Sequence, residues 1–168
     1  MMEYCESGMD FSPLFSHGNS IYIEKSAFYK GLGEGVKTVE FVTLLDKKLF
    51  FIEAKPSAPS LSNPENKERI AEYFQILQDK FHHSLDLLAS KGLGINKDLT
   101  NEFPSCFDAN KLTGCKLVFL LVIQNYSVEG CHGIRTFLWK KLIALRKIWG
   151  IDIVVINSEQ AQRKGYIK

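Results

Sequence analysis

The sequence has no long hydrophobic run. The longest apolar stretches, such as residues 117–123, are far shorter than the roughly 20 residues that a membrane-spanning helix needs. The first twenty residues carry Glu3, Glu6 and Asp10, so they show neither the basic start nor the apolar centre of a signal peptide. We therefore expect a cytoplasmic protein with no membrane partner.

Cysteine is scarce and irregularly spaced. The four cysteines form no CxxC pair and stand far apart, at Cys5, Cys106, Cys115 and Cys131. This spacing disfavours a disulfide framework and a standard zinc site, for which Cys115, Cys131 and His132 would be the residues to consider. We expect reduced thiols, some of them packed in the core.

Neither sign of charge is in large excess. The 21 Lys and Arg residues against 19 Asp and Glu residues leave a net charge of +2. This value permits a phosphate-bearing partner, but it is well below the strongly basic character of a dedicated nucleic-acid binder. A hydrophobic fraction of 45% and a charged fraction of 24% are those of an ordinary globular protein.

The hydrophobic pattern predicts one α/β domain over residues 21–168, preceded by an arm or loop over residues 1–20. One long helix begins after Asn63-Pro64 and ends near Gly92, because apolar residues recur there at steps of three and four. A second helix is expected over residues 130–149. Runs of β-branched and aromatic residues predict strands at 21–24, 36–45, 49–55, 115–123 and 151–156.

The strands at 36–45 and 49–55 form a predicted β-hairpin, since only Asp46, Lys47 and Lys48 separate them. The order after this hairpin is α-β-α-β, and helices that separate buried strands favour a mixed β-sheet flanked by helices.

The register of the hairpin decides which acidic residues share a face. Side chains alternate along a strand, so Glu53 and Lys55 point to the same side. A loop of two or four residues pairs positions whose numbers sum to an odd value, which brings Glu40 to that side as well. A three-residue loop places Glu40 on the opposite face unless a bulge intervenes.

Two carboxylates and a lysine on one face of a sheet suit phosphate chemistry. Mg²⁺ prefers hard oxygen ligands and commonly takes one or two carboxylates. The metal lowers the pKa of a bound water, and a lysine beside it can position that water or stabilise negative charge developing on the phosphate.

Glu40 followed by Glu53-Ala54-Lys55 resembles the PD-(D/E)xK nuclease superfamily, which has the restriction-endonuclease-like fold. In that family an acidic residue on one hairpin strand is followed by an acid-x-Lys on the next strand, and then by a helix and a further strand. The resemblance covers residues 21–125 in element order. It implies a nuclease that hydrolyses phosphodiester bonds of DNA or RNA with Mg²⁺ or Mn²⁺. Glu40, Glu53 and Lys55 would be catalytic, with Glu40 and Glu53 as metal ligands.

The sequence also departs from that family. Val39-Glu40 stands where the family has Pro-Asp, which moves the carboxylate one methylene further from the backbone. Members often carry an acidic residue on a helix before the hairpin. No helix is predicted there, and Glu24 or Glu34 would have to take that place.

Two other functions remain open. A catalytically inactive nuclease-like domain that binds nucleic acid or protein is favoured by the missing Pro-Asp. A structural or assembly domain would leave Glu53 and Lys55 as part of a cross-strand ion-pair set. The basic residues of the second helix would contact phosphate or simply complement the helix dipole; they are Lys140, Lys141, Arg146 and Lys147.

Overall fold

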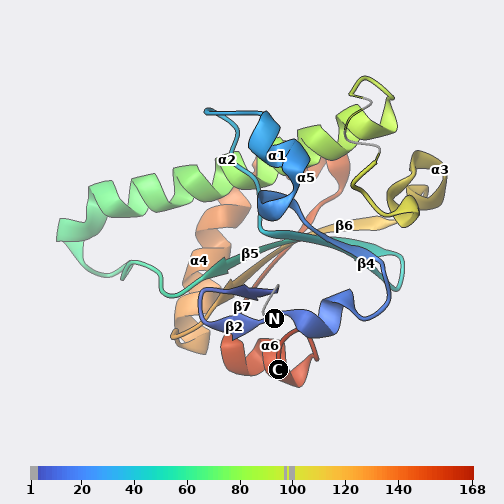
Figure 1. Ribbon diagram of the computed structural model, residues 1–168. Coiled ribbons are helices and arrows are strands. Elements are labelled where there is room, and N and C mark those ends of the chain that lie inside the picture. The colour runs from blue at the N-terminus through green and yellow to red at the C-terminus, as the bar shows by residue number, and fades with distance from the viewer. Residues whose placement is uncertain (1–3, 97, 99–100) are drawn as a thin grey trace.

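A five-stranded mixed sheet forms the centre of the computed structural model, which describes residues 4–96, 98 and 101–168 (Figure 1). The strands lie in the order β3 (Ser20–Tyr22), β4 (Phe41–Leu45), β5 (Lys48–Lys55), β6 (Lys116–Ile123) and β7 (Asp152–Asn157). The β4 strand is antiparallel to both of its neighbours, β3 and β5, while β6 and β7 run parallel to β5. The prediction of a mixed α/β fold whose sheet is flanked by helices is confirmed at this level.

Helices cover the sheet on both faces. On one face, α2 (Lys67–Gly92) and α4 (Val128–Lys141) contribute apolar side chains to a core that includes Leu49 and Phe51 of β5. On the other face, α6 (Ser158–Arg163) packs near Phe50 and Ile52. Figure 1 shows α2 above the sheet and α6 below it. The alternation of side chains along β5 therefore divides the interior into two cores.

Shorter helices connect these elements. They are α1 (Ala27–Gly31), α3 (Ala109–Leu112), α5 (Ile143–Trp149) and the 3-10 helices η1 (Ser12–Phe15), η2 (Ile23–Lys25), η3 (Pro64–Asn66) and η5 (Ser105–Phe107). The α1 helix precedes the hairpin, where the sequence pattern predicted none. The predicted helix over 130–149 is divided into α4 and α5 at Leu142, whose backbone (φ −97°, ψ 19°) leaves helical geometry.

Residues 4–20 are more structured than the predicted arm or loop. They contain a two-stranded ribbon of β1 (Cys5–Glu6) and β2 (Met9–Asp10), followed by η1. Phe11 and Leu14 are buried against the same core as Phe50. The short α6 helix covers only part of this apolar sheet face, and the N-terminal segment covers a further part.

The hairpin turn consists of two residues rather than three. Leu45 pairs with Lys48, which leaves Asp46 and Lys47 as the loop. Both loop residues have left-handed backbones, with φ of 48° and 58°. This conformation matches the twist of a tight β-hairpin.

The first hairpin strand is shorter than the predicted 36–45. It begins at Phe41: before it, the Glu40 carbonyl accepts a hydrogen bond from the Ile23 amide of η2, and two earlier backbone amides donate to side chains of α2. The Lys37 amide donates to His83 Nδ1 (3.0 Å), and the Val39 amide donates to Ser84 Oγ (2.9 Å). These bonds fix α2 beside the start of β4.

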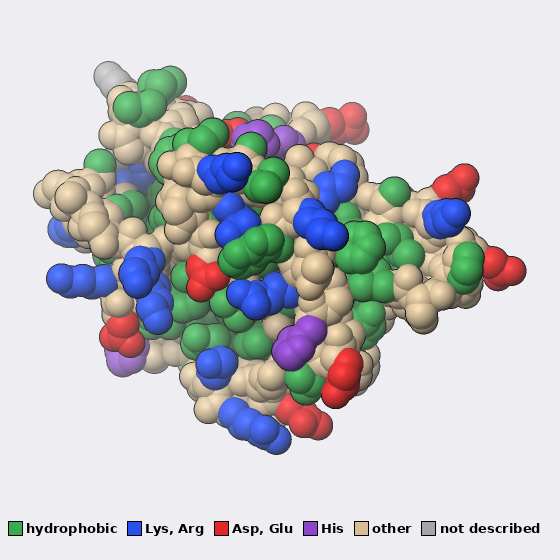
Figure 2. All heavy atoms as spheres, turned by 180° about the vertical axis from the view of Figure 1, so that it is seen from behind, with side chains coloured by type: hydrophobic (Ala, Val, Ile, Leu, Met, Phe, Trp, Pro, Cys, Tyr) green, Lys and Arg blue, Asp and Glu red, His purple; other side chains and the backbone are tan. Residues whose placement is uncertain are grey.

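One surface feature and one property of the helices complete the description of the fold. On the side hidden in Figure 1, Lys and Arg side chains gather around exposed hydrophobic side chains (Figure 2). No helix of the described residues is long and apolar enough to cross a membrane.

Candidate active site

The hairpin register brings Glu40 and Glu53 together. Phe41 pairs with Ile52, so the residue before Phe41 lies opposite the residue after Ile52. This is the odd-sum register, and it places both carboxylates on the face that α2 covers. Their side chains are 4% and 0% exposed. The Ala54 amide donates a hydrogen bond of 2.8 Å to Glu40 Oε2, which fixes the Glu40 carboxylate against the neighbouring strand.

Lys55 reaches the same place from the last position of β5. Its Nζ lies 2.7 Å from Glu53 Oε1, and its side chain remains 24% exposed. The three residues singled out by the sequence pattern therefore meet. Of the two acidic residues considered as a third carboxylate, Glu24 joins them from η2, whereas Glu34 is exposed in the turn after α1.

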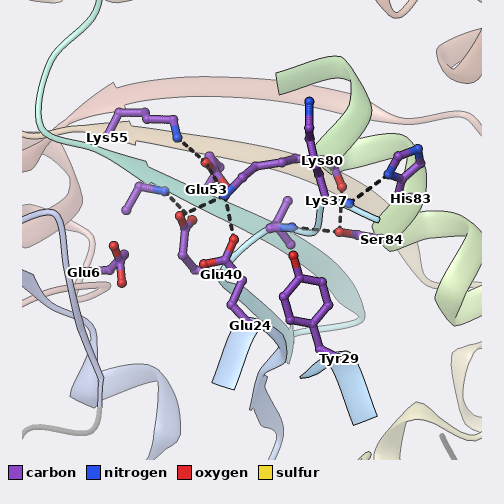
Figure 3. Close-up of polar contacts among 12 residues, drawn as sticks. Glu6, Glu24, Tyr29, Lys37, Glu40, Glu53, Lys55, Lys80, His83 and Ser84 are labelled. Carbon is purple, nitrogen blue, oxygen red and sulfur yellow. Dashed lines mark hydrogen bonds and ion pairs between the residues drawn. The ribbon is translucent and has the colours of Figure 1, made fainter. Parts of the chain in front are cut away.

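A second lysine, Lys80 of α2, lies at the centre of the group (Figure 3). Its Nζ is 2.7 Å from Glu24 Oε1, 2.9 Å from Glu53 Oε1 and 3.3 Å from Glu40 Oε1. The sequence pattern did not identify Lys80. We call Glu24, Glu40, Glu53, Lys55 and Lys80 the charge cluster.

Local structure holds Lys80 in this position. Ser84 donates a hydrogen bond of 2.7 Å to the Lys80 carbonyl and accepts one from the Val39 amide, so α2 is tied to the segment that leads to Glu40. Leu77 and Ser84, one turn away on either side of Lys80, are both buried against the sheet. Lys80 therefore points towards the hairpin because of its phase on the helix.

Burial raises the pKa of Glu40 to about 9, and the negative charge of Glu53 acts in the same direction. Burial acts to lower the pKa of Lys80, but the carboxylates of Glu53 and Glu40 outweigh it and raise that pKa. At neutral pH Glu40 is therefore protonated and Lys80 is charged.

The buried carboxylates have oxygen atoms that suit a metal ion. Glu53 Oε1 lies at ion-pair distance from both lysines, yet within the described residues it accepts no hydrogen bond of ordinary alignment. Glu40 and Glu53 together give the one or two carboxylates that Mg²⁺ commonly takes. Their donor chemistry fits such an ion, but the Lys80 ammonium contacts the same two carboxylates.

Larger donor sets are not found. Among residues 4–96, 98 and 101–168, no group of three or more His, Cys, Asp or Glu side chains could hold a metal ion. This includes the zinc alternative of Cys115, Cys131 and His132. Cys131 is a buried residue of α4, and the Sγ atom of Cys115 is 3.9 Å from the carbonyl oxygen of Lys111 on α3.

The basic residues of α4 and α5 make their contacts outside the charge cluster. Arg146 stacks on Trp139, with its Cζ atom 3.2 Å from the ring centroid. Lys140 lines a groove of about 420 Å³ together with His132, Arg135 and Trp139. Within the described part of the chain, no hydrogen bond or ion pair joins these residues to the charge cluster.

Comparison with known proteins adds no relative. No protein-family model matches the chain, and no curated protein or solved structure matches it.

Proposed function

We propose that the protein is a metal-dependent nuclease with a restriction-endonuclease-like fold, which hydrolyses phosphodiester bonds of DNA or RNA. The observation that carries this proposal is the meeting of Glu40, Glu53 and Lys55 on one face of the hairpin, in the register that the resemblance to the PD-(D/E)xK superfamily requires. The order of strands and helices after the hairpin supports it as well.

The residues have distinct roles in this proposal. Glu40 and Glu53 would hold Mg²⁺ or Mn²⁺, and the bound ion would supply a water of lowered pKa and polarise a phosphate oxygen. Lys55 is anchored by Glu53 and is the more exposed of the two lysines in the charge cluster. Its ammonium can therefore reach a phosphate at the surface and stabilise the negative charge that develops there.

One observation favours a second function, a nuclease-like domain that binds nucleic acid or protein without catalysis. The Lys80 ammonium contacts all three acidic side chains of the charge cluster. If Lys80 stays there permanently, the buried carboxylates have a structural counter-ion and need no metal.

Nuclease assays on purified protein separate the two functions. Plasmid DNA and a structured RNA are incubated with the protein in Mg²⁺ or Mn²⁺, with EDTA as the metal-free reaction. We expect cleavage that EDTA abolishes and that Lys55→Ala reduces to background with little change in melting temperature, because Glu53 keeps Lys80 as a partner. Lys48→Ala is the matched control, since Lys48 is an exposed lysine at the other end of β5.

Full cleavage by the Lys55→Ala protein would contradict the nuclease proposal. Absence of cleavage by the unmodified protein, together with metal-independent nucleic-acid binding that weakens steeply with salt, would favour the second function.

A further inference from the structure

Lys80 differs from Lys55 in how completely acidic groups surround it. Lys55 has one carboxylate partner in the charge cluster, whereas the Nζ atom of Lys80 lies within 3.3 Å of three. The Lys80 side chain is only 12% exposed. An ammonium at such a depth is stable only when opposite charges replace the water it has lost. Glu24, Glu40 and Glu53 therefore surround the Lys80 ammonium with acidic groups that hold it at this position.

A divalent cation on Glu40 and Glu53 would need the same carboxylates. Mg²⁺ binds oxygen at about 2.0–2.1 Å, which requires direct access to the lone pairs. Lys80 Nζ already lies 2.9 Å from Glu53 Oε1 and 3.3 Å from Glu40 Oε1. The Lys80 ammonium and a divalent metal ion in this space would repel each other strongly, because the environment is poorly hydrated. Occupation by Lys80 and occupation by a metal therefore exclude each other.

The third acidic side chain, Glu24, offers the Lys80 ammonium an alternative ion-pair position. Glu24 makes the shortest contact with Nζ, 2.7 Å, and its side chain is the most exposed of the three at 30%. Lysine carries its charge on a flexible four-carbon stem. Moving the ammonium away from Glu40 and Glu53 would require a rotation of this stem, in which the ion pair with Glu24 could be kept.

We propose that Lys80 is an internal counter-ion that competes with a divalent metal for Glu40 and Glu53, so that the site opens only when the metal displaces the lysine. This inference rests on the proposed function only in taking Glu40 and Glu53 as the metal-binding pair. It gives the lysine a regulatory role, because the metal concentration then sets the fraction of open sites.

Metal binding itself tests this inference, without any measurement of cleavage. Mn²⁺ is titrated into the unmodified protein, Lys80→Met and Lys91→Met, with binding followed by calorimetry and by the paramagnetic signal of free Mn²⁺. Methionine keeps the length of the side chain and removes its charge. Lys91→Met is the matched control, because Lys91 is a second buried lysine of α2 whose partner is Asp108, at 2.9 Å, outside the charge cluster.

We expect Lys80→Met to bind Mn²⁺ at least about tenfold more tightly than the unmodified protein, which corresponds to about 1.4 kcal/mol of competition. We expect Lys91→Met to bind as the unmodified protein does. If Lys80→Met does not fold by itself, the double variant Lys80→Met/Glu24→Gln removes one of the uncompensated carboxylates and is titrated instead, against Glu24→Gln alone.

Equal Mn²⁺ affinity with and without Lys80 would overturn the competition and leave the metal site intact. Absence of Mn²⁺ binding in every protein would overturn both the competition and the proposed nuclease.

Discussion

Glu40→Gln replaces a buried carboxylic acid by an uncharged side chain of nearly the same shape. Burial and the neighbouring Glu53 raise the pKa of Glu40 from an ordinary 4.5 to about 9. Between these two pH values the folded protein holds a proton on Glu40 that the unfolded chain has released. The amide of glutamine imitates the protonated form and cannot titrate.

The sign of the pH dependence follows from proton binding. Where the folded state binds more protons than the unfolded state, the free energy of unfolding falls as the pH rises. The contribution of Glu40 is therefore complete below about pH 4.5 and is lost as the pH approaches 9. One proton of difference changes the free energy of unfolding by at most about 1.4 kcal/mol per pH unit. The lowered pKa values of Asp10 and Asp108 act below this interval, because their ordinary value is 3.8.

Urea unfolding followed by circular dichroism, between about pH 5 and pH 9, measures this effect. We expect Glu40→Gln and the unmodified protein to be similar in stability at the acidic end. Towards the alkaline end the variant becomes more stable by up to about 1.4 kcal/mol per pH unit. Glu159→Gln is the control, since Glu159 is an exposed glutamate on α6 with a weak ion pair to Arg163. A stability difference that stays constant with pH would refute the protonation of buried Glu40.

Two further substitutions test the structure outside the charge cluster, each by the urea midpoint. Lys47→Gly is expected to stabilise the protein by about 1 kcal/mol, because Lys47 has a left-handed backbone (φ 58°) that glycine adopts without strain; an unchanged or lower midpoint would contradict the turn geometry. Asn157→Ala is expected to destabilise it by about 1 kcal/mol, because Asn157 caps α6 by accepting a hydrogen bond of 3.0 Å from the Gln160 amide; a midpoint equal to that of the unmodified protein would argue against this cap.

The hairpin could be predicted because it depends on local rules, whereas its register was left open between loop lengths. Strand alternation and loop length alone decide whether Glu40 can share a face with Glu53 and Lys55. The sequence suggested a three-residue interruption at 46–48, but Lys48 joins β5 and leaves the two-residue loop that the site requires. The start of β4 could not be predicted in this way, because side chains of α2 bond to the backbone at Lys37 and Val39.

The misjudged segments are those whose structure depends on distant partners. Residues 4–20 carry the turn-forming Pro13 and Gly18, which favour a loop, yet Phe11 is fully buried in the core below the sheet. The interruption between α4 and α5 at Leu142 has no proline or glycine to mark it. Leu142 itself is buried, so tertiary packing at this residue accompanies the interruption of the helix.

Lys80 was missed although the sequence contains a signal for it. Leu77, Lys80, Ser84, Leu88 and Lys91 follow one another at steps of three and four, which is the spacing of a single helix face. A lysine on the buried face of a helix requires an acidic partner on whatever element that face covers. Both lysines of this face have one: Lys91 pairs with Asp108, and Lys80 with the carboxylates of the hairpin.

Lysines on the buried, mostly apolar face of α2 therefore predict that this helix covers acidic residues. They do not predict which acidic residues these are. Lys91 shows that the same signal also arises from a simple pair of one lysine and one aspartate at the edge of the core. The difference lies in the number of carboxylates that converge. The number of carboxylates depends on which part of β5 the helix α2 packs against. No local sequence pattern specifies that position. A single partner makes the lysine part of a structural pair, whereas three ionised glutamates carry more negative charge than Lys80 neutralises, and one charge more than Lys80 and Lys55 neutralise together. This excess is the physical reason to expect either a protonated Glu40 or an exchangeable cation at this position, and the pH and Mn²⁺ titrations measure these two responses separately.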